Sequence, residues 1–146
     1  MASLPALVYR RCDEPHVSTR GVLLGLDNFV SRTPDDVVLT TEDELTLIAS
    51  GIDLCGGLFS DGTTSFRGKV YEMLVLEVTG ESLTREWLPP ETLAEMADRL
   101  DECDPETVGE DFDLGERWTP SPGEIRDLRR LFRICAERGL GLIAWA

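Results

Sequence analysis

The strongest local signal in this 146-residue chain is a helix whose two ends are both marked in the sequence. Ser121-Pro122-Gly123-Glu124 is a capping box, in which the serine hydroxyl and the glutamate carboxylate satisfy free amides of the first turn. Proline suits the first helical position, and Gly139 supplies a left-handed stop. These signals predict a helix over residues 122–138. Its apolar stripe consists of Ile125, Leu128, Leu131, Phe132 and Cys135.

The last residues of the chain, Gly141 to Ala146 (GLIAWA), follow this helix directly and are almost entirely apolar. Such a short run predicts a strand that returns to the core. A single strand needs a neighbour, and the short segment Ala6 to Arg10 is one candidate. The C-terminal region therefore predicts a helix followed by a strand.

Three further segments have helical patterns. Thr41-Glu42-Asp43-Glu44 is a second capping box, which predicts a helix over 42–50 that stops near Gly51. Residues 70–78 are apolar except for two glutamates that a helix places on one side, which predicts a largely buried helix. After two prolines, residues 91–103 have apolar side chains at helical spacing and predict an amphipathic helix.

The strands between these helices are predicted to be short. Val37-Val38-Leu39 is typical of a brief strand, and the run 21–30 fits either a strand or a short helix. The tight turn signal Asp61-Gly62 predicts a hairpin within 54–66. With four main helices and a few short strands, including a C-terminal one, the predicted class is helix-dominated α+β.

Composition places the chain among globular proteins, with 42% apolar and 29% charged residues. At 146 residues we expect a single domain, residues 1–146, with an acidic loop at about 101–120. The first ten residues lack a basic region and a long apolar run, and no stretch approaches the length of a membrane-spanning helix. We therefore expect a cytoplasmic protein that does not bind membranes.

Catalytic and metal signatures are missing from the sequence. There is one histidine, His16, no G-x-S-x-G elbow, and no cluster of ligands at metal spacing. The cysteines form no C-x-x-C pair and are expected to be reduced thiols, with Cys135 in the core. These features favour a non-enzymatic protein with no metal and no cofactor. The cysteines are Cys12, Cys55, Cys103 and Cys135.

The net charge of −14 is unevenly distributed along the chain. Residues 1–35 are neutral, residues 36–116 carry −17, and residues 117–146 carry +3. A chain this acidic repels nucleic acid, so we expect no nucleic-acid binding. It is suited instead to a basic protein partner.

The most acidic segment is 101–116 (DECDPETVGEDFDLGE), which has eight acids and no base. Its proline and glycines predict a loop, which is either a solvated linker or a surface that faces a partner. A calcium site is disfavoured because the full EF-hand ligand order is missing. The arginines of the helix over 122–138 either face solvent, clamp this segment, or present a second docking surface. The candidate partner-binding residues are Asp101, Glu102, Asp104, Glu106, Glu110, Asp111, Asp113 and Trp118.

A second candidate site is the segment 63–69, which contains the only lysine of the chain. If Ser65 caps the helix that follows, Arg67 and Lys69 lie in its first turn, where the helix dipole disfavours cations. Internal acids, or a bound phosphate or carboxylate, would offset that cost. Alternatively, the helix begins later and both cations lie in a loop. The candidate anion-binding residues are Thr63, Thr64, Ser65, Arg67 and Lys69.

Two functional hypotheses result from these patterns. The first is an acidic protein-binding domain that docks a basic partner, as small immunity or inhibitor proteins do when they cover a cationic active site. The second is a small-anion or nucleotide-binding domain that uses residues 63–69. The sequence favours the first, and it leaves the oligomeric state open.

Overall fold

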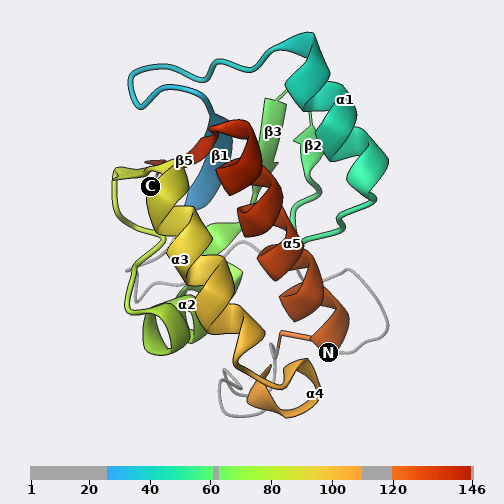
Figure 1. The fold of residues 1–146 in the computed structure, drawn as a ribbon, viewed down its shortest axis with the longest axis vertical. Coiled ribbons are helices and arrows are strands. Elements are labelled where there is room, and N and C mark those ends of the chain that lie inside the picture. The colour runs from blue at the N-terminus through green and yellow to red at the C-terminus, as the bar shows by residue number, and fades with distance from the viewer. Residues whose placement is uncertain (1–25, 61–62, 110–119, 146) are drawn as a thin grey trace.

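Four helices dominate the part of the chain that the computed structural model describes, which is residues 26–60, 63–109 and 120–145. α3 and α5 pack side by side, and α2 lies behind α3 (Figure 1). α1 lies at the periphery and contacts α5 only sparsely. The four helices are α1 (Thr41–Ser50), α2 (Glu72–Thr79), α3 (Pro90–Asp101) and α5 (Pro122–Arg138), and a single turn, α4 (Pro105–Val108), lies between the last two.

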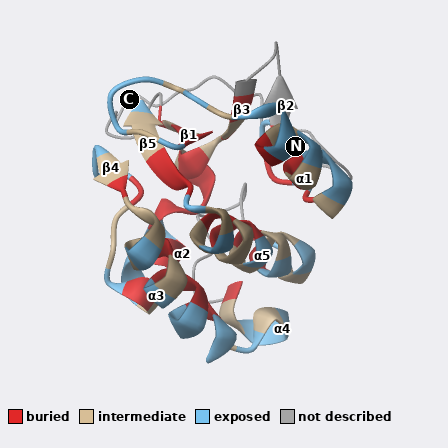
Figure 2. Cartoon of the chain, turned by 45° about the horizontal axis from the view of Figure 1, so that its top comes forward, coloured by how far each residue is buried: buried red, intermediate tan, exposed pale blue. Residues whose placement is uncertain are grey.

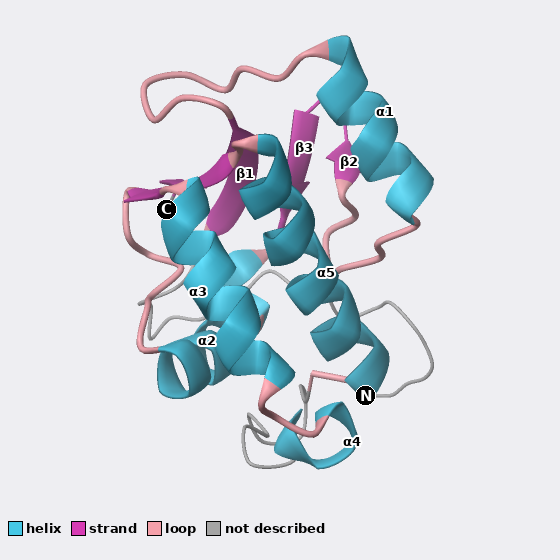
Figure 3. Ribbon diagram, viewed as in Figure 1, coloured by secondary structure: helices cyan, strands magenta, loops and turns pink. Residues whose placement is uncertain are grey.

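The strands form a five-stranded sheet in the order β2-β3-β1-β5-β4, with every neighbouring pair antiparallel. Figure 3 shows the strands in magenta, with β1, β3 and β2 side by side. The C-terminal strand pairs with β1 on one side and β4 on the other. The predicted helix-dominated α+β class is therefore confirmed. The strands are β1 (Asp27–Ser31), β2 (Phe59–Ser60), β3 (Thr63–Phe66), β4 (Trp87–Leu88) and β5 (Gly141–Trp145).

The core lies between the helices and one face of the sheet, where buried residues gather (Figure 2). Val30 of β1 pairs with Leu142 of β5, and both side chains are fully buried. Their neighbours Phe29 and Ile143 point to the opposite face and are only partly buried, as the two-residue period of a strand requires. The helices thus cover one face of the sheet.

Most predicted elements are present with small shifts at their ends. α5 spans the predicted residues, and its capping box and left-handed Gly139 (φ 74°) are both formed. α2 begins two residues later than expected, and α3 begins at Pro90 and ends two residues earlier. The predicted hairpin is formed by β2 and β3. The candidate strand Ala6 to Arg10 lies outside the described residues.

Two local predictions are wrong. The N-cap of α1 is Thr40 rather than Thr41, and its reciprocal partner is Asp43 rather than Glu44, because the Asp43 carboxylate is directed inward. The segment 37–39 is a loop rather than a strand. Its backbone returns to the end of β1, where the amide of Arg32 donates to the carbonyl of Val38 at 2.8 Å.

Candidate functional site

The acidic segment is partly structured and partly neutralised by the chain itself. Its first residue, Asp101, ends α3 and pairs with Arg129 at 3.2 Å and with Arg133 at 2.7 Å. Glu106 of α4 forms an ion pair with Arg126. Arginines of α5 therefore clamp the described part of this segment, which was one of the three alternatives that the sequence left open.

The other described candidate residues of this segment, Glu102 and Asp104, do not pair with the arginines of α5. Asp104 caps α4 by accepting a hydrogen bond from the amide of Glu106 at 3.0 Å. Glu102 is exposed and makes no side-chain hydrogen bond or ion pair within the described ranges. The prediction that 101–116 is a loop is thus wrong for the turn of helix at 105–108, because Pro105 and the Asp104 cap initiate it. Glu110, Asp111, Asp113 and Trp118 lie outside the described residues.

The segment 63–69 does not have the helix N-terminus that the sequence suggested. Thr63, Thr64 and Ser65 belong to β3, and a single 3-10 turn, η2 (Gly68–Val70), precedes α2. The expectation that Ser65 caps the buried helix is therefore wrong, because β3 pairs this residue with Phe29 of β1. Arg67 and Lys69 precede α2, so neither cation lies in its first turn.

Both cations of this segment have interaction partners in the chain. The guanidinium of Arg67 pairs with Asp27 at 3.0 Å, and its backbone amide donates to the carbonyl of Cys55 at 2.8 Å. Thr64 is buried, and Lys69 also has an interaction partner. Arg67 therefore has an internal carboxylate, that of Asp27, as its partner, which agrees with the first of the alternatives that the sequence left open.

Next to this segment, the structure leaves one buried acceptor without a donor. The side-chain amide of Asn28 donates to the carbonyl of Leu83 at 2.9 Å, which fixes the orientation of the side chain. Its Oδ1 is buried and has no hydrogen-bond partner among the described residues. It faces Gly68, where an added Cβ would come within 1.8 Å of it. An oxygen acceptor in this position repels an anion rather than attracting one.

A buried carboxylate, Asp43, fixes the orientation of α1. Arg32 donates to both of its oxygens at 2.7 Å, and Arg138, at the end of α5, donates at 3.0 Å. Burial by itself raises the pKa of Asp43, but the hydrogen bonds from Arg32, Thr40 and Arg138 outweigh it, so the pKa lies well below its usual value of 3.8. Asp43 therefore stays charged and holds three parts of the chain together.

With Asp43 and Leu47 buried, α1 presents the opposite side to solvent. We call Thr41, Leu45, Ile48 and Ala49 the α1 outer face, since successive steps of 100° place them on one side of the helix. Leu45 is 60% exposed and Ile48 is 57% exposed. Sequence reasoning missed this surface. The signal was the stripe Leu45, Ile48 and Ala49, which an amphipathic helix would normally turn toward the core.

The three cysteines within the described ranges differ in their chemical state. Cys103 and Cys135 are free thiols, whereas Cys55 is disulfide-bonded, so the expectation of reduced thiols is wrong for Cys55. Burial raises the pKa of Cys135 to about 12, which keeps its thiol protonated.

The described residues define a helix-dominated α+β domain with an acidic exterior. Within them, no three His, Cys, Asp or Glu side chains lie together in a way that would hold a metal ion. None of their helices combines the length and apolar character that crossing a bilayer requires. Comparisons of the chain with protein-family models, with curated proteins and with solved structures find no match.

Proposed function

We propose that this chain is a non-enzymatic, acidic protein-binding domain that docks a basic protein partner, in the manner of small immunity or inhibitor proteins. The observation that carries the proposal is the placement of the arginines. Each of the nine arginines in the described ranges donates to, or pairs with, an acceptor of this same chain. The basic C-terminal part of the sequence therefore supplies no separate cationic surface there.

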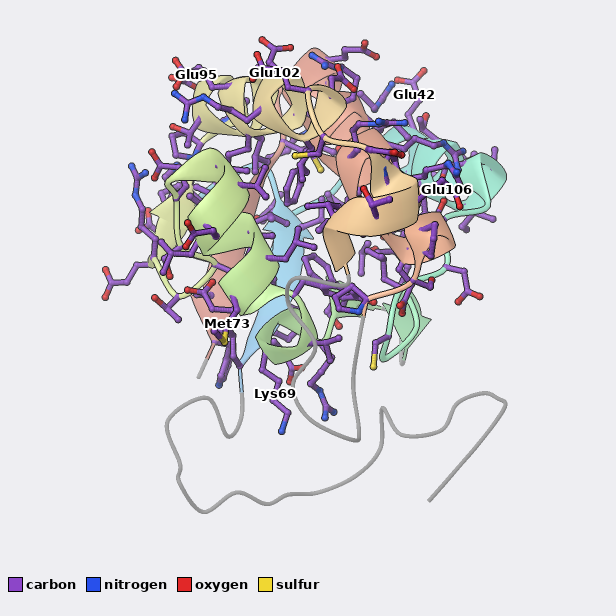
Figure 4. All side chains as sticks on the ribbon, turned by 90° about the horizontal axis from the view of Figure 1, so that it is seen from below. Glu42, Lys69, Met73, Glu95, Glu102 and Glu106 are labelled. Carbon is purple, nitrogen blue, oxygen red and sulfur yellow. The ribbon has the colours of Figure 1, made fainter. Side chains whose placement is uncertain are left out.

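A large set of surface acids, in contrast, has no cation of the described residues as a partner. Figure 4 shows two of them, Glu95 and Glu102, projecting from the side of the molecule opposite Lys69 and Met73. One sign of charge thus predominates on the outside, and such a field raises the association rate of an oppositely charged protein. The full set is Asp35, Asp36, Glu44, Asp53, Glu77, Glu86, Glu91, Glu95, Glu102, Asp104 and Glu137.

The proposal is tested by immobilising the protein and identifying what it retains from an extract of its source at about 50 mM and about 500 mM salt. We expect basic proteins that are retained at low salt and depleted at high salt. Each candidate is then purified and its association rate is measured directly. A charge-neutralised variant, Glu91→Gln/Glu95→Gln/Glu102→Gln, should associate more slowly while its dissociation rate changes little.

The triple variant is a clean test because these three side chains are exposed and make no described ion pair. If no basic protein binds directly at either salt concentration, the proposal is wrong. An association rate that is insensitive to both salt and the triple variant would also contradict it, because steering by charge would then be absent.

The alternative, a small-anion site at residues 63–69, is not favoured by a specific observation. Arg67 already has a carboxylate partner, and the nearest orphaned polar atom is the acceptor Oδ1 of Asn28. Both features work against the binding of an anion.

A further inference from the structure

The feature that carries a further inference is the apolar stripe that α1 exposes to solvent. A surface helix normally turns its apolar stripe toward the core and its charges toward water. α1 departs from this rule, because it buries the carboxylate of Asp43 beside Leu47 and exposes Leu45 and Ile48. The exposed stripe is therefore available for another molecule.

This orientation is held by bonds at both ends of the helix. At the N-terminal end, Arg32 and Arg138 hold Asp43 inside. At the C-terminal end, Arg130 donates to the carbonyl of Ser50 and also pairs with Asp127 at 3.1 Å. Turning Leu45 and Ile48 inward would carry Asp43 to the solvent side and break these contacts. The guanidinium groups of Arg32 and Arg138 would then lose their shared carboxylate, which is destabilising. The outer face is thus a fixed surface of the fold.

The borders of the α1 outer face are acidic on both sides. On a helical wheel with 100° per residue, Glu42 lies next to Ala49 on one side of the stripe. Glu44 lies next to Ile48 on the other side. Glu44 has no ion pair among the described residues, and Glu42 has only a 3.7 Å contact to Arg138 while its side chain remains 84% exposed. Of the nearby arginines, Arg32 and Arg138 have Asp43 as their closest partner.

We propose that the α1 outer face receives a basic amphipathic helix of the partner, packed along α1 with its apolar stripe on Leu45 and Ile48 and with Lys or Arg on either side facing Glu42 and Glu44. This inference rests on the proposed function and names the place and the chemistry of the contact. Helix-on-helix packing through an apolar stripe with charged flanks is a common recognition mode. Charge decides the occupant, because a second copy of this chain, at −14, would bring acids against acids.

The test uses two synthetic fluorescent peptides of identical Leu and Lys composition. In the first, the leucines repeat at helical spacing and form one stripe, whereas in the second the order is scrambled so that no stripe forms. Binding to the full chain is followed by fluorescence anisotropy at low and high salt. We expect the striped peptide to bind about tenfold or more tightly than the scrambled one, since only it offers apolar surface to Leu45 and Ile48.

The decisive comparison is between two double variants. Leu45→Gln/Ile48→Gln removes the apolar stripe of α1, and Met73→Gln/Leu76→Gln makes the same kind of change on α2, where the side chains are 54% and 48% exposed. Glutamine is as good a helix former as leucine or methionine, so both variants are expected to fold. We expect the α1 variant to bind the two peptides equally, and the α2 variant to keep the preference of the natural chain.

The outcomes separate this inference from the proposed function. If the α1 variant keeps the preference, or if the natural chain binds both peptides equally and in a salt-dependent way, the α1 contact is wrong while a charge-steered binding domain survives. If neither peptide binds at low salt, the proposed function fails as well. Self-association of the natural chain that the α1 variant abolishes would also overturn the inference, because a second copy would then be the occupant.

Discussion

The carboxylate of Asp43, which has no exposure to solvent, accepts hydrogen bonds from Arg32 on both of its oxygens, at 2.7 Å each. Arg32 follows β1, Asp43 begins α1, and the third partner, Arg138, ends α5. One buried charge thus joins the end of β1, the first turn of α1 and the end of α5, and Arg138 is 95 residues away from Asp43 in the sequence.

Replacing this carboxylate by an amide should destabilise the fold strongly. Asp43→Asn leaves two guanidinium groups facing a neutral side chain and weakens the α1 cap, so we expect a loss of about 2–4 kcal/mol in the free energy of unfolding. This loss is measured by urea unfolding of the natural chain and the variant. The matched control is Glu42→Gln, at the neighbouring but exposed position, which should change the free energy by less than about 0.5 kcal/mol. Equal effects of the two substitutions would mean that the buried cluster does not stabilise the fold.

Because of the same carboxylate, the free energy of unfolding should depend on pH in the acidic range. The pKa of Asp43 is lower in the folded chain than its usual 3.8, so folding favours the charged form. Its stabilisation is therefore fully present above about pH 4–5 and is lost as the pH falls toward the folded-state pKa. The difference in unfolding free energy between the natural chain and Asp43→Asn should be constant near neutrality and should narrow between about pH 5 and about pH 3. A difference that stays constant over that range would contradict the assignment.

Local sequence signals are sufficient to locate both ends of α5, but they are insufficient to locate the start of α1 or the side that it buries. Every feature that sets the ends of α5, from Ser121 to Gly139, lies within the helix or beside it. At the start of α1, Thr40 and Thr41 are both acceptable caps, and Thr40 is the one that pairs with the buried Asp43. Asp43 is held in place by Arg32 and by Arg138, which lies 95 residues further along the chain. The direction in which α1 faces depends on the same distant contact, so the sequence pattern alone favours the wrong side.

The candidate sites, like the start of α1, depend on contacts between residues that are distant in the sequence. The acids of 101–106 are easily found in the sequence, but their neutralisation depends on arginines of α5 that lie 20 to 32 residues away. The segment 63–69 has the residue types of an anion site, yet β3 forms because Phe66 pairs with Asn28 of β1 across a long separation. Residue type is visible in one sequence, whereas the partner of each side chain is decided by the tertiary fold.

Gly68 is expected to be intolerant of any side chain. A Cβ at this position would lie 1.8 Å from Oδ1 of Asn28 and 3.3 Å from Cγ of Leu26. Gly68→Ala must therefore displace Asn28 and break its hydrogen bond to the carbonyl of Leu83, at a cost of about 1–3 kcal/mol or more. The control is Gly123→Ala in the first turn of α5, where the nearest atom lies 3.9 Å away. Thermal unfolding should show a lower midpoint for the first variant and an equal or higher one for the second.

The buried hydroxyl of Tyr71 bridges two elements that precede and follow it in the chain. It accepts a hydrogen bond from the amide of Cys55 at 2.8 Å and donates to the carboxylate of Glu124 at 2.8 Å. Tyr71→Phe keeps the ring but leaves that amide without an acceptor, so we expect a loss of about 1–3 kcal/mol in denaturant unfolding. Burial, followed by the charge of Glu124, raises the pKa of Tyr71 well above 10.0, so folding favours its protonated form.

The stabilisation from the Tyr71 hydroxyl should therefore be present at neutral pH and should be lost as the pH rises above about 10, where the unfolded chain ionises and the folded one does not. A double-mutant cycle with Glu124→Gln separates the bridge from the capping role of Glu124. The two substitutions share one hydrogen bond, so the double variant should lose less stability than the two single losses combined. Strict additivity would show that the hydroxyl and the carboxylate act independently, and the bridge would then contribute nothing to holding α5 against the segment around Cys55.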